Sequence, residues 1–331
     1  MIFGIETSCD ETACAIVKDG REVLANVVAS QIKTHREFGG VVPEVAAREH
    51  LEAINLAIAE TFERAGIKAC EVDAFSATVG PGLVGCLLVG LNAAKTLALV
   101  HNKPFIGVNH LQAHVCANFI DTDLKPPFVC LLVSGGHTQI IKVEDFDNQV
   151  IVAQTIDDAV GEVYDKAARL MGLPYPGGVT LDKLAQEGNP RAFQLPEAKV
   201  GFDEFSFSGL KTAVLRLVQS FEGTELPVND ICASFQERVS DTLIKKTLYW
   251  AEHFGYDTIV LAGGVAANSE LRKKLFALED DNARGDVHTK YKTFAPQMKY
   301  CTDNASMVAT CAYFNPIKCN EPLNLEVFSR A

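Results

Sequence analysis

Hydrophobic and polar residues follow the same order in two separate stretches of the chain. Residues 2–17 form an apolar run, a polar turn and a second apolar run, and residues 128–143 repeat this order around the turn Ser-Gly-Gly-His-Thr at 134–138. Two apolar runs joined by a short polar segment predict two β-strands connected by a turn. Helical patterns follow both stretches, at 43–64 and 160–171. The sequence therefore predicts a duplicated α/β fold with a cleft between its halves.

Two further segments fit such a fold. Residues 258–262 predict a strand that runs directly into Gly263 and Gly264, and a helix is expected after it with Ser269 as its N-cap. The most apolar stretch, residues 83–100, is long enough to raise the question of a membrane span. Because this stretch also contains glycines, an asparagine and a lysine, we expect a buried helix of a large globular fold instead.

Composition narrows the class of protein. The chain has 331 residues, of which 48% are hydrophobic and 22% charged, and these fractions are typical of a globular protein of one large or two ordinary domains. A domain boundary is expected near residues 121–127, where acids, a lysine and two prolines cluster. The ten cysteines form no CxxC pair, which argues against a zinc ribbon or a thioredoxin motif. The N-terminal residues lack the pattern of a secretory signal, so we expect a reducing, cytoplasmic location.

Glycines follow two of the predicted strands. In Ser134-Gly135-Gly136 and in Gly263-Gly264, the absence of side chains would let backbone N–H groups approach an anion such as phosphate. The plainer interpretation, that each pair merely turns the chain, holds for any single turn of this kind. Two such turns at equivalent places favour phosphate binding. Neither turn matches GxxxxGK[ST] or GxGxxG, so P-loop and Rossmann sites are not predicted.

Two histidines are spaced for a metal site. His110 and His114 are four residues apart, which places both imidazoles on one face of a helix. A zinc or iron site needs at least one more protein ligand. Asp303 is a plausible third ligand, but spacing alone does not choose it over other acids, and an isolated HxxxH pair is more often coincidence. A zinc protease would need a glutamate after the first histidine, where this chain has Leu111.

Several acids and one mixed segment lie beside the predicted turns. Asp10-Glu11, Asp157-Asp158, Asp165 and Asp182 are either solvated surface residues or parts of a site. Asp182 stands out because it follows the Pro-Gly-Gly turn at 176–178. Residues 205–211 combine aromatic side chains with hydroxyls and a lysine, which fits either an amphipathic strand leading into a helix or a loop that contacts substrate.

Taken together, the motifs resemble one known family along the whole chain. The chain resembles the tRNA N6-adenosine threonylcarbamoyltransferases, or TsaD proteins, once described as O-sialoglycoprotein endopeptidases. Residues 39–44 resemble the bacterial branch. The resemblance rests on residues 4–12, 39–44, Lys95-Thr96, Pro104, His110, His114, 134–138, 157–166, 175–178, 205–212, 263–268 and 301–304.

The resemblance implies both a fold and a reaction. The fold is the duplicated ribonuclease-H-like fold of actin, sugar kinases and chaperone ATPases, with a nucleotide bound between an N-terminal half, 1–125, and a C-terminal half, 126–331. The reaction is transfer of the threonylcarbamoyl group from threonylcarbamoyl-AMP to N6 of adenosine 37 in tRNAs that read codons beginning with A, which forms t6A. The resemblance also implies two protein partners, a paralogous subunit without the metal site and a P-loop ATPase.

By motif position, the resemblance implies roles for individual residues. His110, His114 and Asp303 would hold one divalent metal, with iron expected before zinc. Asp10 or Glu11 would position the attacking amine or accept its proton, a hypothesis that rests on their place in the first turn. The residues that would bind the adenylate substrate are Leu132, Val133, Ser134, Gly135, Gly136, Asp165, Gly178, Asp182 and Asn268.

Three alternatives remain open from the sequence. A kinase or ATPase of the same fold would use the glycine turns without needing His110, His114 and Asp303. A metalloprotease and a non-enzymatic scaffold are weaker interpretations. The formal charge of −12 argues only against tight, unaided tRNA binding, since a basic stretch at 272–299 or a partner protein could supply the surface that receives tRNA.

Overall fold

The computed structural model describes residues 1–280 and 291–329 and divides into two compact units. The first unit consists of residues 1–125 together with 296–331, and the second of residues 126–295. The prediction that 126–331 form one C-terminal half is therefore wrong for the last segment. The physical reason is helix α10 (Ala305–Phe314), whose buried residues pack on strands of the first unit. Part of the basic stretch at 272–299 lies outside the described residues.

The first unit is built on a five-stranded sheet in the order β3-β2-β1-β4-β5. Strand β1 pairs antiparallel with β2 and parallel with β4, and β2 pairs antiparallel with β3. The first two strands form the predicted strand–turn–strand. The strands are β1 (Ile2–Glu6), β2 (Glu11–Lys18), β3 (Glu22–Ser30), β4 (Ala74–Gly80) and β5 (Phe105–Asn109).

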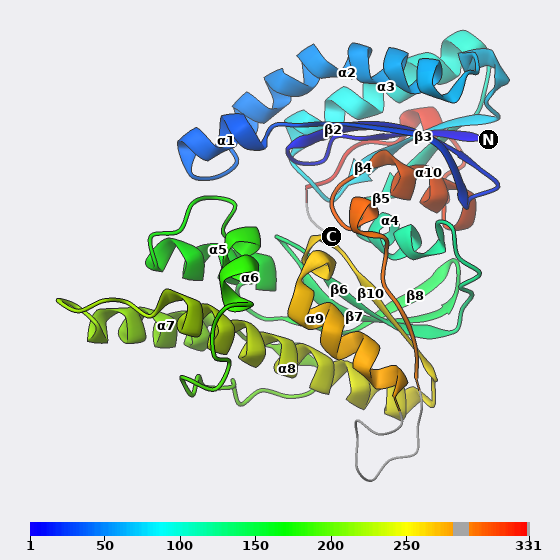
Figure 1. The fold of residues 1–331 in the computed structure, drawn as a ribbon. Helices are drawn as coiled ribbons and strands as arrows, with labels where there is room; N and C mark the ends of the chain where they lie inside the picture. The colour runs from blue at the N-terminus through cyan, green and yellow to red at the C-terminus, as the bar shows by residue number, and fades with distance from the viewer. Residues whose placement is uncertain (281–290, 330–331) are drawn as a thin grey trace. The chain divides into compact units, whose positions relative to one another are not determined.

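Helices cover both faces of this sheet (Figure 1). Helices α2 and α3 pack on one face, where Phe3, Phe75 and Leu91 belong to the buried core, and α10 and α4 lie on the other. The helices of the unit are α1 (Ile32–Phe38), α2 (Pro43–Ala65), α3 (Val84–His101), α4 (His110–Cys116) and α10.

Helix α3 contains the apolar stretch that raised the membrane question. Within the described residues it is the one helix whose length and composition would suffice to cross a bilayer, a test that core helices also pass. Here α3 contacts β4 and α2 and buries a stripe that includes Cys86, Leu87, Leu91 and Ala94. This packing accounts for the buried stripe, whereas Val84, Leu88, Leu99 and Val100 of the same helix are exposed.

The second unit repeats the strand order of the first. Its sheet runs β11-β10-β6-β7-β8-β9, so β8-β7-β6-β10-β11 corresponds to β3-β2-β1-β4-β5, with the same antiparallel and parallel pairings. The predicted duplication is thus confirmed. The strands are β6 (Phe128–Val133), β7 (Thr138–Asp145), β8 (Asn148–Thr155), β9 (Glu204–Phe205), β10 (Thr258–Ala262) and β11 (Lys292–Phe294).

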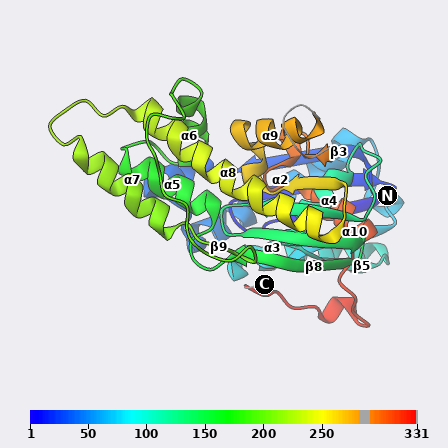
Figure 2. The ribbon, with the colours of Figure 1, turned by 90° about the horizontal axis from the view of Figure 1, so that it is seen from below.

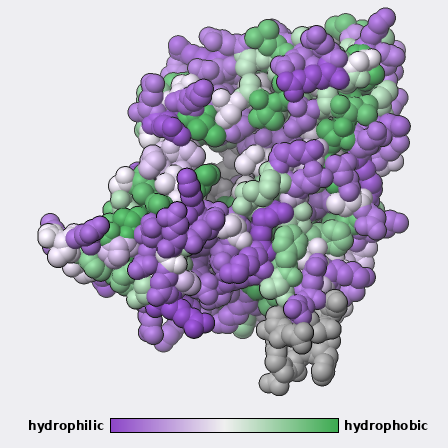
Figure 3. All heavy atoms as spheres, in the orientation of Figure 1, coloured by the Kyte–Doolittle hydropathy of each residue, from purple (hydrophilic) through white to green (hydrophobic). Residues whose placement is uncertain are grey.

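The long helix α8 contacts β6 and β10, and shorter helices pack beside it (Figure 2). Residues 205–211 form the end of the short strand β9 and the start of α7, in agreement with the strand-to-helix interpretation. The helices are α5 (Val160–Leu170), α6 (Gly177–Ala185), α7 (Ser208–Ser220), α8 (Val228–Phe254) and α9 (Ser269–Phe276). The face of the protein seen in Figure 3 is largely hydrophilic, with hydrophobic residues in separate small groups.

Candidate functional site

Three side chains of the first unit converge on one point. His110 and His114 lie on α4, and Asp303 lies just before α10. The Asp303 Oδ1 atom is 3.2 Å from His114 Nε2 and 3.7 Å from His110 Nε2, and the three candidate ligand atoms lie within 4.8 Å of one another. The structure therefore brings Asp303, which spacing could not single out, to the two histidines.

Local structure explains how α4 presents its histidines. The Asn109 side chain caps the helix by accepting hydrogen bonds from the backbone N–H groups of Leu111 and Gln112. His110 is consequently the first helical residue, and His114 follows one turn later on the same face. Their rings lie 4.7 Å apart between centroids.

The cluster is largely buried, and its charged groups shift one another's pKa values. The side chains of His114, His110 and Asp303 are 1%, 12% and 20% exposed. Burial would raise the pKa of Asp303, but the neighbouring imidazoles outweigh it and lower this pKa to about 2. Burial would lower the pKa of His110, but Glu6 and Asp303 raise it to about 9. The site therefore holds a carboxylate that attracts positive charge.

The donor set fits a divalent transition metal. Two imidazole nitrogens and one carboxylate oxygen form a three-ligand set that leaves coordination positions for substrate, as catalytic zinc and non-haem iron sites do. The Nδ1 atom of His114 is buried and finds no hydrogen-bond partner among the described residues. Its opposite nitrogen, Nε2, faces Asp303, so the ring is oriented toward the cluster.

The turn between β1 and β2 carries the two proposed catalytic acids. The Glu11 carboxylate accepts a hydrogen bond from Ser30 Oγ at 3.2 Å. Burial, followed by the negative charges of Asp303 and Asp10, raises the pKa of Glu11 to about 9. The influence of Asp303 on Glu11 indicates that this carboxyl group lies in the electrostatic field of the histidine–aspartate cluster.

Glu6 was not singled out in the sequence, yet it touches the cluster directly. Its carboxylate is fully buried at the end of β1 and lies 3.2 Å from His110 Nδ1. Burial would raise the pKa of Glu6, but His110 and Ser8 reverse this effect and hold the pKa below its usual value. The available signal was an acidic residue directly following the apolar run of a predicted buried strand.

A histidine on α2 braces the same turn. His50 is completely buried, and its Nδ1 lies 2.7 Å from Thr12 Oγ1 while its Nε2 lies 3.0 Å from the Cys9 carbonyl oxygen. A neutral imidazole satisfies both contacts, donating from Nε2 and accepting at Nδ1. Burial lowers the pKa of His50, in keeping with this neutral form. His50 thus spans the ends of the segment that contains Asp10 and Glu11.

The corresponding turn of the second unit is made mainly of backbone. The Ser134 N–H donates to the His137 carbonyl at 2.8 Å, and Ser134 Oγ accepts from the His137 N–H at 3.1 Å. A Cβ atom placed on Gly135 or Gly136 would meet none of the described residues within 4 Å. Leu132 and Val133 are fully buried in β6 and serve to position this open turn.

The Asp165 side chain is hydrogen-bonded to the backbone of the turn that contains Gly178. The Asp165 Oδ1 atom accepts from the backbone N–H groups of Gly177 at 2.8 Å and Gly178 at 3.2 Å, at the start of α6. Burial raises the pKa of Asp165, although these two hydrogen bonds oppose the shift. Asp165 therefore fixes the Pro-Gly-Gly turn.

Asp182 and Asn268, far apart in the sequence, meet in a polar cluster. The Asp182 Oδ1 atom accepts from Gln236 Nε2 at 2.9 Å, Asn268 Nδ2 at 3.2 Å and Ser269 Oγ at 2.7 Å. The Asn268 side chain also accepts from the Leu271 N–H and caps α9. The prediction of Ser269 as the cap is thus wrong by one residue, because the amide oxygen of Asn268 takes this role.

The remaining acid pair ties two loops together. Asp157 accepts hydrogen bonds from Ser206 Oγ and the Phe207 N–H, and Asp158 forms ion pairs with Lys166 at 2.8 Å and Lys211 at 3.2 Å. These contacts hold residues 205–211 against the start of α5. They give the pair a clear structural role.

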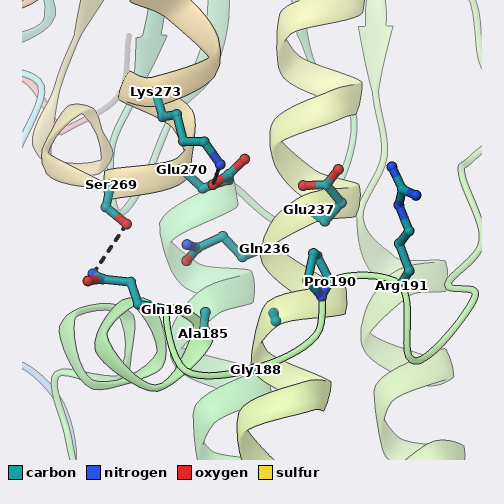
Figure 4. Close-up of a pocket in the computed structure, with 11 residues that line it drawn as sticks. Ala185, Gln186, Gly188, Pro190, Arg191, Gln236, Glu237, Ser269, Glu270 and Lys273 are labelled. Atoms are coloured by element: carbon teal, nitrogen blue, oxygen red, sulfur yellow. Dashed lines mark hydrogen bonds and ion pairs between the residues drawn. The ribbon is translucent and has the colours of Figure 1, made fainter.

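A polar cavity of about 570 Å³ adjoins the Asp182 cluster in the second unit. Ser269 and Gln236, both partners of Asp182, line it, and Gln186 donates a hydrogen bond to Ser269 Oγ at 3.3 Å (Figure 4). The Glu270 and Lys273 side chains form an ion pair at its rim. Polar groups from α8, α9 and the residue that follows α6 (Gly177–Ala185) therefore surround a space large enough for a small ligand.

Solved structures share the fold at low sequence identity. HypF from T. kodakarensis aligns with a TM-score of 0.62 and 16% identity over 98% of this chain and 49% of that protein. Component A of the (R)-2-hydroxyglutaryl-CoA dehydratase from Acidaminococcus fermentans aligns with a TM-score of 0.54 and 17% identity over 94% and 97%. A hexokinase of the ROK type from Thermus thermophilus aligns at 0.50 with 13% identity over 95% and 98%. These likenesses agree with the predicted ribonuclease-H-like fold.

Sequence relatives are much closer. A family model described as TsaD: tRNA N6-adenosine threonylcarbamoyltransferase matches residues 22–310. The protein of that name from Nostoc punctiforme is 53% identical over 99% of this chain and 95% of its own length. Its counterpart from Microcystis aeruginosa is 51% identical over 94% and 91%. The chain belongs to the TsaD family, the tRNA N6-adenosine threonylcarbamoyltransferases.

Proposed function

We propose that this enzyme transfers the threonylcarbamoyl group from threonylcarbamoyl-AMP to N6 of adenosine 37 in tRNAs that read codons beginning with A. Membership of the family supports the reaction class, because the relatives carry the name of this activity. The observation that carries the proposal on the structural side is the convergence of His110, His114 and Asp303. A kinase or ATPase of the same fold would have no use for such a cluster.

His110, His114 and Asp303 would hold one divalent metal ion, Fe²⁺ in the first place and Zn²⁺ in the second. When bound, this ion supplies Lewis-acid chemistry, polarising a carbonyl or phosphoryl oxygen of the substrate. The three protein ligands would hold the ion and leave further coordination positions for substrate. Two neutral nitrogen donors and one anionic oxygen donor suit both metals.

The acids of the first turn would act on the tRNA. The exocyclic amine of adenine is a weak nucleophile because its lone pair is delocalised into the ring, so it must be oriented and must lose a proton during attack. Asp10 or Glu11 would orient this amine or accept the proton. Burial and the charge of Asp303 raise the pKa of Glu11 to about 9, so the protonated Glu11 would be suited to orient the amine at neutral pH. A cation held by Asp303 would lower this pKa and favour the carboxylate form that accepts a proton.

The second unit would bind the adenylate. The Ser134 hydroxyl and the open backbone N–H groups of Gly135 and Gly136 would donate hydrogen bonds to the phosphate and stabilise its charge as AMP leaves. Leu132 and Val133 support this turn from β6. The residues proposed to hold the rest of the adenylate are Asp165, Gly178, Asp182 and Asn268, and the contacts of Asp182 with Asn268 support their joint action.

We also propose that the enzyme works in the cytoplasm, away from membranes, with a paralogous subunit that lacks the metal site and with a P-loop ATPase. The net charge of −12 supports a need for partners, because an acidic protein repels the phosphate backbone of tRNA. A basic surface contributed by another subunit would offset this repulsion.

The test is reconstitution. The enzyme and its partners are incubated with unmodified tRNA, threonylcarbamoyl-AMP and Fe²⁺ or Zn²⁺, and the tRNA is digested to nucleosides. We expect threonylcarbamoyladenosine to form, to disappear when the metal is stripped, and to return when metal is restored. A tRNA with another base at position 37 and the variant Gln112→Ala, on the same helix as both histidines, serve as controls. Absence of the modified nucleoside under all conditions would overturn the proposal.

A further inference from the structure

We propose that Glu6 is a positioning residue of the metal site, which orients the His110 imidazole so that its Nε2 atom faces the ion. The inference rests on the proposed function, because it assumes that His110, His114 and Asp303 bind a metal. It adds to that function a residue that does not touch the metal. It also gives the orientation of the His110 ring a cause that can be tested by metal binding alone.

The Glu6 carboxylate is held in place by three groups from different parts of the first unit. Its Oε1 atom accepts a hydrogen bond of 2.6 Å from the Ser8 N–H, and its Oε2 atom accepts one of 2.6 Å from Thr78 Oγ1. The same Oε2 atom lies 3.2 Å from His110 Nδ1. An ionised carboxylate with no solvent exposure is tolerated only when such partners satisfy it. The carboxylate is therefore fixed on one side of the imidazole.

This arrangement determines which nitrogen of His110 is available to a metal. A metal bound at Nε2 would displace the proton there and leave the remaining ring proton on Nδ1, which is donated to Glu6 Oε2. Ser8 Oγ lies 3.2 Å from the same nitrogen. The lone pair then resides on Nε2, the atom that lies 3.7 Å from Asp303 Oδ1. Carboxylates that accept the second ring proton of a metal-bound histidine fix both its tautomer and its orientation.

The two histidines differ in this respect. His110 Nδ1 has Glu6 and Ser8 beside it, whereas His114 Nδ1 has no hydrogen-bond partner among the described residues. His114 is instead held by nearly complete burial. Glu6 lies on the far side of the His110 ring from Asp303 and its oxygens are already occupied, so it is suited to orient a ligand and not to be one.

The experiment measures Co²⁺ affinity of the purified full-length protein by chelator competition, together with the visible absorption spectrum of bound Co²⁺. The variants are Glu6→Gln and Thr78→Val, the second of which keeps the carboxylate but removes one of its donors. Ser76→Ala is the matched control for Thr78→Val. Ser76 lies on the same strand as Thr78, β4, and its buried hydroxyl donates to the Phe3 carbonyl instead of to Glu6. Circular dichroism and thermal unfolding of the metal-free proteins verify that each variant is folded.

We expect Glu6→Gln to weaken Co²⁺ binding by about 10- to 100-fold, the usual effect of losing such an outer partner, and to alter the Co²⁺ spectrum. Thr78→Val should weaken binding in the same direction, and Ser76→Ala should match the wild type. If folded Glu6→Gln and Thr78→Val bind Co²⁺ as tightly as the wild type with the same spectrum, Glu6 has no positioning role. Asp303→Asn distinguishes the absence of a positioning role for Glu6 from the absence of the metal site. If this variant also binds Co²⁺ like the wild type, the proposed metal site is wrong.

Discussion

The first turns of the two units occupy the same place in the same strand order but differ in chemistry: one presents charged side chains and the other presents backbone. Between β1 and β2, the turn carries Asp10, leads into Glu11 and Thr12 at the start of β2, and is braced by His50. Between β6 and β7, Gly135 and Gly136 leave the backbone open. One turn therefore presents carboxylates, and the other presents amide groups.

This difference shows how a duplicated fold can serve two ligands of opposite charge. Carboxylates and imidazoles in the first unit suit a cation, and N–H groups unobstructed by side chains in the second suit a phosphate. Under the proposed function, the repeated sheet would supply the position and the residues at the ends of its strands would decide what binds there. Substitutions in the two units should therefore fail in different ways.

The largest effect is expected at the metal ligands of the first unit. Asp303→Asn and His114→Ala remove a ligand, and since a Lewis acid contributes several kcal/mol to transition-state stabilisation, transfer should fall by about 10²- to 10³-fold or more. Single-turnover assays and metal analysis of the purified protein measure this. Full transfer by either variant with no bound metal would remove the chemical distinction between the two units.

A substitution in the glycine turn of the second unit should weaken substrate binding without lowering the stability of the protein. A Cβ atom at Gly135 meets none of the described residues within 4 Å, so Gly135→Ala should fold normally and unfold at the same temperature or slightly higher. If phosphate rests on this turn, the methyl group should raise the KM for threonylcarbamoyl-AMP by about tenfold, the loss of one hydrogen bond of roughly 1.4 kcal/mol. An unchanged KM would argue that the phosphate binds elsewhere.

The converse is expected for a glycine that touches the first turn. A Cβ atom on Gly82 would lie 2.8 Å from both Cβ and the backbone oxygen of Ser8. Gly82→Ala should therefore lower the free energy of unfolding by about 1–3 kcal/mol through overpacking, as measured by urea denaturation. Gly135→Ala provides the matched control in the other unit. Equal stabilities of the two variants would contradict the difference in packing between the turns.

The smallest effect concerns pH. Burial lowers the pKa of His50 in the folded protein, whereas unfolded histidine titrates near about 6.5. The unfolded chain thus binds a proton that the folded chain resists, so the free energy of unfolding should fall as the pH drops below about 6.5 and be fully retained above it. His50→Gln should show a shallower decline between pH 6.5 and 5 in urea titrations. Parallel curves for the two proteins would show that His50 does not titrate in this way.

The local pattern of apolar and polar residues was sufficient to predict the first strands of the repeated sheet. It was not sufficient to predict which unit each later segment joins. The two apolar–turn–apolar stretches predicted the first strands of both units correctly. The return of residues 296–331 to the first unit was missed, because the apolar helix α10 carries no local signal of which sheet it will cover. Asn268 was passed over as a helix cap because Ser269, beside it, is an equally common capping residue.

In the candidate site, too, the sequence predicted relations between neighbouring residues but not between residues far apart in the chain. The spacing of His110 and His114 predicted that they share a helix face, and α4 presents them in this way. The choice of Asp303 came only from the family resemblance, since nothing in the spacing relates it to a helix so far away in the sequence. Glu6 escaped notice because its partners, Thr78 and His110, come from two other elements.

The late return of the chain to the first unit has a consequence for biosynthesis. His110 and His114 leave the ribosome before the second unit is made, and Asp303 leaves after it. Until then α10 is missing from the face of the sheet that it covers, and the nascent first unit exposes apolar surface there. Loading of the proposed metal would therefore be coupled to completion of the polypeptide: a prematurely terminated chain retains both histidines but cannot assemble the three-residue cluster.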